Sequence, residues 1–236
     1  MPFAVASYGL GGILIPLGAV TLLIAPLVRW LPSASSRQHD VSAAGASAGV
    51  GPALLALSIL LIWCIGLGGI YAFEERIGVA GGLEQTRVGS ALAVAVAIGF
   101  LGAMAASWVA DRWGRILPVS VALLAQVGAI ALLQGELSWI EFAVSASVFH
   151  FFWNFTGPYL MGMVASSDAT GRIAVLMPAA QTGGFAAGTA LAGNLMAEGS
   201  LLAANGVAIA GCLIALVVFV PAALAASRRQ AEPVEA

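Results

Sequence analysis

His150 and Asn154 are the two polar residues of this chain whose spacing best suits the binding of a solute. They lie four residues apart in an otherwise apolar and aromatic segment, 140–165. Because residues four apart share one face of a helix, the two side chains would project in the same direction. Polar groups in such surroundings are costly unless they meet a partner or a wet cavity. The spacing therefore predicts a polar surface on an apolar helix.

Two prolines strengthen this prediction. Pro158 cannot donate to the carbonyl of Asn154, and its ring crowds that carbonyl, so an acceptor is freed at the same depth. Gln181 follows Pro178 at a similar depth of the next apolar segment. Broken helices with acceptors at mid-depth bind substrates in transporters. We expect His150, Asn154 and Gln181 to contact a substrate; the alternative is a bond to a neighbouring helix, worth about 1 kcal/mol.

A second pattern, D-x-x-G-R-I, occurs at 111–116 and again at 168–173. In each copy the Asp can accept N–H bonds at the start of the following helix. The Gly permits a turn, and the Arg side chain can reach the headgroup layer of a membrane. Because the flanking sequences differ, we interpret the repeated pattern as the same loop structure used twice and not as an internal repeat of the chain.

Catalysis and metal binding are not indicated by the residue types. His150 has no second histidine at the same depth, and the one G-x-S-x-G stretch, at 45–49, lies in a small and polar segment far from His150 in the sequence. Cys64 and Cys212 lie far apart within apolar runs, which suggests neither a disulfide framework nor a metal site. We expect no enzyme activity, no cofactor and no metal.

Composition assigns the chain to the membrane. It is 61% hydrophobic and 8% charged, and it contains no lysine. Its mean hydropathy is +1.00. Soluble domains carry about 25% charged residues. Apolar runs of about 20 residues span a bilayer as helices, so the predicted fold is an all-α polytopic bundle.

We predict about seven transmembrane helices. Their ranges are 4–28, 52–73, 89–110, 116–134, 140–165, 172–196 and 202–226. The domain organisation is a first helix within 1–31, a small and polar cytoplasmic linker at 32–51, a six-helix bundle at 52–226 and a tail at 227–236.

The arginines orient these spans. One side holds seven arginines, namely Arg29, Arg37, Arg112, Arg115, Arg172, Arg228 and Arg229. The other side holds only Arg76 and Arg87. Basic residues favour the cytoplasmic side, so the C-terminus is expected in the cytoplasm and the N-terminus outside. The first run lacks a basic n-region and an A-x-A site, which favours an ordinary span over a signal peptide.

The stretch "SWVADRWGR" resembles the loop signature of the major facilitator superfamily, with Ser107 where that family usually has Gly. The stretch "GFAAGTALAG" is similar to the family's glycine-rich signature, and its Gly184 and Gly188 form a G-x-x-x-G packing face. In that family two six-helix halves are joined by a long cytoplasmic linker. The chain resembles the last helix of a first half, the linker and a complete second half.

The resemblance implies a secondary transporter that moves a small organic solute by alternating access across a bacterial inner membrane. It implies a gating loop formed by Asp111, Arg112, Gly114 and Arg115, and coupling to protons is a family expectation. The other wall of the cavity would come from a longer chain, a separate subunit or a homodimer. The sequence does not identify the solute.

The alternative function is a seven-helix receptor, or a ligand-binding membrane protein without transport. A retinal pump is excluded because the chain has no lysine to form the Schiff base. Gln126, at mid-depth of another helix, is expected to pack rather than to bind. Glu74 and Glu75 are expected to be solvated acids at the outer end of a span, beside Tyr71, and either would couple to protons only if it faced the cavity.

Overall fold

The computed structural model describes residues 50–109, 112–168, 170–197 and 201–231, and six isolated positions between 15 and 26. The chain divides into two compact units, 1–46 and 47–236. All that follows concerns the second unit. The predicted first span, 4–28, and the linker, 32–51, lie almost entirely outside the described residues.

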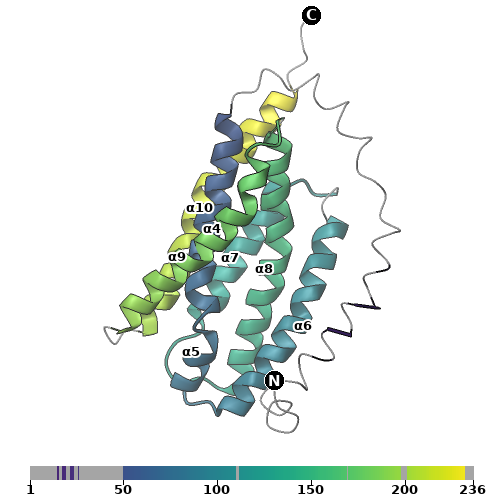
Figure 1. Cartoon of the computed structure of the whole chain (residues 1–236). Coiled ribbons are helices and arrows are strands. Elements are labelled where there is room, and N and C mark those ends of the chain that lie inside the picture. The colour runs from purple at the N-terminus through teal and green to yellow at the C-terminus, as the bar shows by residue number, and fades with distance from the viewer. Residues whose placement is uncertain are drawn as a thin grey trace, which may run out of the picture. The chain divides into compact units, whose positions relative to one another are not determined.

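The described part of the second unit is helical, and no strand occurs in it (Figure 1). The helices are α4 Gly51–Tyr71, α5 Glu74–Ala80, α6 Gln85–Val109, α7 Ile116–Ala131, α8 Trp139–Ser167, the 3₁₀ helix η3 Ala174–Leu176, α9 Met177–Ala197 and α10 Leu201–Ala231. The six later predicted spans agree with these helices to within a few residues at most ends. The exceptions are α6, which begins four residues earlier than predicted, α9, which begins five residues later, and α10, which ends five residues later. The predicted span 52–73 continues into the short α5 after a break at Ala72 and Phe73.

Three helical stretches of the described residues are long and apolar enough to cross a membrane. They are Gly51–Ala80, Gln85–Val109 and Leu202–Arg228. At about 1.5 Å of rise per residue, each exceeds the hydrocarbon thickness of a bilayer. A helical bundle is therefore confirmed, and the three apolar stretches are consistent with a membrane protein, while the full set of seven spans stays a prediction.

Two helices form the middle of the bundle. The buried α4 packs against α8, α9 and α10, and α8 packs against α4, α6 and α7 (Figure 1). Trp63 of α4 is fully buried and donates its indole N–H to Gln126 Oε1 of α7 at 3.1 Å. Gln126 thus packs inside the bundle, as the sequence predicted.

Glycines bring the neighbouring backbones close together. A Cβ added to Gly184 of α9 would lie 2.7 Å from the Cβ of Cys64, and one added to Gly188 would overlap the carbonyl of Ile65. On the other side of the bundle, a Cβ on Gly102 of α6 would overlap the carbonyl of Phe151 of α8. Small residues of this kind let membrane helices approach to backbone contact.

Candidate functional site

The central feature of the site is a buried pair formed by His150 and Glu74. Nε2 of His150, from α8, lies 3.0 Å from Oε2 of Glu74, the first residue of α5. The side chains are 5% and 3% exposed, respectively. The prediction that Glu74 is a solvated acid is therefore wrong. Buried charges in a membrane bundle are costly and mark functional positions.

The backbone explains why Glu74 turns inward. Helix α4 ends at Tyr71, and α5 begins three residues later, so the chain keeps nearly helical spacing across the break. Leu67 and Ile70 are fully buried, and Glu74 falls four residues after Ile70. Helical periodicity therefore continues the buried face into the acid. This periodicity was the signal in the sequence that could have identified Glu74.

Half of the Glu74 carboxylate is unpaired. Its Oε1 is inaccessible to solvent, and no donor among the described residues reaches it. A buried acceptor without a partner costs about 1–3 kcal/mol. Such an atom in an otherwise well-packed region indicates a place where a donor from outside the chain could bind.

Three aromatic rings lie beside His150, those of Tyr71, Phe149 and Trp153, and Phe185 packs against two of them; we call these four residues the aromatic cluster. The ring centroids of Tyr71 and Trp153 are 4.7 Å apart, and those of Trp153 and Phe185 are 5.5 Å apart. The His150 ring lies 5.5 Å from Phe149, 5.6 Å from Trp153 and 6.3 Å from Tyr71. Tyr71 is 53% exposed, so the cluster reaches from the buried pair to the surface of the described bundle.

Asn154 is exposed and lies at the edge of this region beside α6. Its Nδ2 donates to the carbonyl of His150 at 2.9 Å, and a Cβ added to Gly99 of α6 would lie 2.7 Å from the same nitrogen. Gln181 of α9 is half-buried and donates to Sδ of Met161 at 3.3 Å. Among the described residues, no hydrogen bond joins Gln181 to His150 or Asn154. The structure links Asn154 to His150 and places Gln181 beside α8, further along that helix.

The predicted gating loop is described from Arg112 onward, and Asp111 lies outside the described residues. The Arg112 guanidinium lies 4.6 Å from the centroid of the Trp108 ring. Arg115 donates from Nη1 to Ser166 Oγ at 2.9 Å, which connects this loop to the last turn of α8. Gly114 has a φ of 67°, a conformation that glycine adopts without strain.

The second copy of the pattern is described almost completely. Asp168 Oδ2 accepts from the backbone N–H groups of Ile173 and Ala174 at 2.7 and 2.8 Å. The Ala174 bond is the main reason that the pKa of Asp168 lies below its usual value. Gly171 has a φ of 71°, close to that of Gly114. The shared left-handed glycine and the Asp168 cap support the interpretation of the same loop structure used twice.

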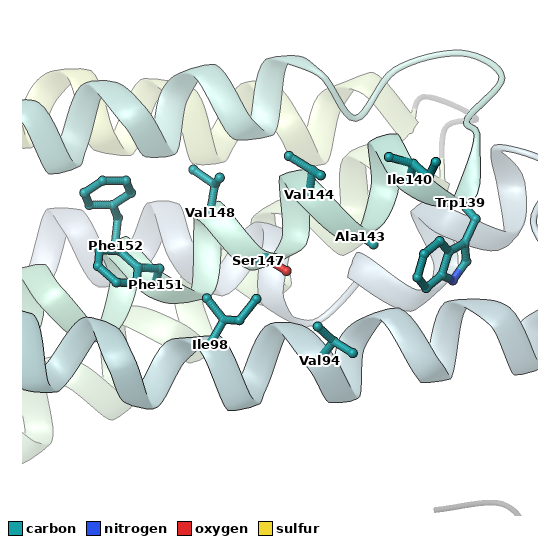
Figure 2. A pocket seen from close by; sticks show the side chains of 10 residues that line it. All are labelled: Val94, Ile98, Trp139, Ile140, Ala143, Val144, Ser147, Val148, Phe151 and Phe152. Carbon is teal, nitrogen blue, oxygen red and sulfur yellow. The ribbon is translucent and has the colours of Figure 1, made fainter.

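An apolar groove of about 500 Å³ lies on another face of α8, beside α6 (Figure 2). The α6 residues Val94 and Ile98 form one wall, and Ser147 supplies the only side-chain hydroxyl. The remaining lining residues are Trp139, Ile140, Ala143, Val144, Val148, Phe151 and Phe152. None of the three predicted substrate residues lines this groove. Solute sites need polar groups that fix orientation, and this groove has almost none.

Metal ligands do not gather in the described part of the chain. No three residues of the His, Cys, Asp and Glu types lie together there. Cys64 and Cys212, both buried, are free thiols.

Comparison of the chain with protein-family models, with characterised proteins and with solved structures finds no match. The functional argument therefore depends on the site itself.

Proposed function

We propose that this protein is a secondary transporter that moves a small organic solute by alternating access, with the solute bound beside the His150–Glu74 pair. The observation that carries the proposal is this pair itself, an ionisable pair 3.0 Å apart within a membrane bundle. Intramembrane ionisable residues most often belong to substrate or ion pathways. The half-exposed Tyr71, a ring neighbour of His150, and the exposed Asn154, one helical turn further along α8, supply aromatic and polar groups near the pair.

We further propose that the described bundle is one half of a major facilitator protein, with seven spans in the present chain. The support is the D-x-x-G-R-I loop between α6 and α7, the second and third predicted spans after the linker, and the long polar linker itself before α4. The exposed face that carries Asn154 would then line a cavity whose other wall comes from a longer chain, a separate subunit or a second copy.

Alternating access is testable without knowing the solute. Asn154→Cys, in a background where Cys64 and Cys212 are replaced by Ala, is labelled with a membrane-impermeant maleimide in right-side-out and in inverted vesicles. A transporter exposes Asn154→Cys to water from both sides in turn, so labelling is expected in both preparations. Val144→Cys is the matched control, because Val144 is likewise exposed on α8, at 53%, but lines the apolar groove, and it should stay unlabelled.

Labelling of Asn154→Cys from one side only would contradict alternating access and would favour the receptor alternative. Labelling from neither side would remove the proposed cavity altogether. The source of the second wall is tested separately, by the mass of a C-terminally tagged product from the native locus. A product near twice 23.8 kDa would indicate a longer chain, and one near 23.8 kDa would indicate a subunit or a dimer.

A further inference from the structure

The charge around the proposed solute site is one-sided. Every arginine whose side chain the structure describes lies outside the middle of the bundle and is exposed: Arg76, Arg87, Arg112, Arg115, Arg172 and Arg228. Glu74, in contrast, is buried at 3% exposure. Among the described residues, the His150 imidazole is the only basic group beside it, at 3.0 Å. Since Glu74 already occupies that imidazole nitrogen, the described site offers no free basic group for an anion.

The pair also has an unused hydrogen-bond acceptor. When the Nε2–H of His150 donates to Glu74 Oε2, the carboxylate retains a second oxygen, Oε1, which no described donor reaches. An ionised carboxylate only accepts hydrogen bonds. A ligand that satisfies Oε1 must therefore supply a donor, and a charged N–H donor makes the stronger bond.

The aromatic cluster supplies the second requirement of a cation site. Tyr71, Trp153 and Phe185 come from three different helices, and their centroids lie within 6.3 Å of one another. Aromatic faces attract ammonium groups, and Trp and Tyr do so more strongly than Phe. Tyr71 is both the most exposed member and a ring neighbour of His150, so a ligand entering from the exposed face meets these rings before it meets the pair.

We propose that the solute is a small organic amine in its protonated form, whose ammonium group donates to Glu74 and whose apolar body packs against the rings of Tyr71, Trp153 and Phe185. Tyr71 is the last residue of α4, beside the break that precedes α5. In this proposal the Tyr71 ring moves aside to admit the ammonium group to the buried carboxylate. The inference rests on the proposed solute site and specifies what that site recognises.

The test uses phenethylammonium as the probe and 2-phenylethanol as its neutral counterpart. Binding of radiolabelled phenethylammonium is measured on the full chain in lipid nanodiscs, with unlabelled 2-phenylethanol as competitor. We expect saturable binding that the alcohol does not displace at equal concentration. Displacement by the alcohol, or the absence of saturable binding, would overturn the assignment of a cation.

Glu74→Gln should weaken binding by about tenfold or more, because a charged partner contributes at least 1.4 kcal/mol to such a bond. Glu75→Gln is the matched control: the adjacent carboxylate is exposed and accepts from Gln85 at 3.0 Å, and its loss should leave binding unchanged. Equal effects of the two changes would mean that only the general surface charge matters, and the proposal would fail.

The aromatic contribution is separated from folding by a graded pair. Trp153→Phe keeps a ring and should retain most of the affinity, whereas Trp153→Leu should lose roughly three- to tenfold. Equal affinities in the two variants would contradict the role of the rings. The binding assay is independent of the maleimide labelling. If phenethylammonium fails to bind while Asn154→Cys is still labelled from both sides, the amine is rejected as the solute and the proposed transport activity stands.

Discussion

Two faces of α8 differ in the interactions that their residues make. The face toward α4, α5 and α9 carries His150 and Trp153 and depends on charge and hydrogen bonding. The face toward α6 carries the Phe151 carbonyl against Gly102, and beside it lies the apolar groove, so this side depends on shape. The difference teaches that one helix can carry a buried ionisable pair on one face and pack by shape alone on another.

The charged face should give the largest loss of stability when it is broken. His150→Leu leaves Glu74 buried without its partner, which is expected to cost about 3–5 kcal/mol of unfolding free energy. The double change His150→Leu with Glu74→Leu should recover most of that loss, because no charge remains buried. The measurement is unfolding in mixed micelles with increasing SDS. Additive losses in the double variant would contradict a coupled pair.

The face toward α6 should respond to added volume. Gly102→Ala places a Cβ onto the carbonyl of Phe151 and is expected to cost about 1–3 kcal/mol, while phenethylammonium binding per folded molecule is retained. Gly128→Ala of α7 is the matched control, since its added Cβ meets nothing within 4 Å. The same SDS titration checks both variants. Equal stabilities would show that the α6 contact is looser than the structure has it.

The sequence predicted the helices well because their signal is local. Long apolar runs determine where α4, α6 and α10 lie, and left-handed glycines lie in the loops that follow α5, α6, α7 and α8. Glu74 was misplaced because the prediction treated the end of a span as the end of burial, whereas α5 continues the buried face after the break. Its partner His150 lies 76 residues away along the chain. Such a pairing depends on how distant helices pack against each other, and a local sequence pattern does not predict that packing.

Asp168, which lies on neither of these two faces, should contribute to stability in a way that depends on pH. Its pKa in the folded state is lowered, first by the bond from the Ala174 N–H. The ionised carboxylate therefore stabilises the fold above the unfolded-state pKa of about 3.9, and this stabilisation is lost as the pH falls through the lower pKa of the folded state. Wild type should exceed Asp168→Asn in stability at neutral pH, and the gap should narrow in acid. Thermal unfolding at several pH values measures this gap. A gap that does not change with pH would contradict the cap.

The groove should give the smallest effect. Ser147→Ala removes its one hydroxyl and is expected to change stability by less than about 0.5 kcal/mol, with no change in phenethylammonium binding. The SDS titration and the binding assay together check this expectation. A loss of binding comparable to that of Glu74→Gln would move the solute site from the charged face to the groove.

The most direct measurement compares the two surroundings of α8 in one experiment. Spin labels are attached at Asn154→Cys and at Val144→Cys in proteoliposomes, and their collisions with a water-soluble nickel complex and with oxygen are measured. The account predicts that the label at 154 collides mainly with the nickel complex and that the label at 144 collides mainly with lipid-dissolved oxygen. The same preference at both positions, or the reverse order, would contradict a wet solute site beside Asn154 and lipid at the groove.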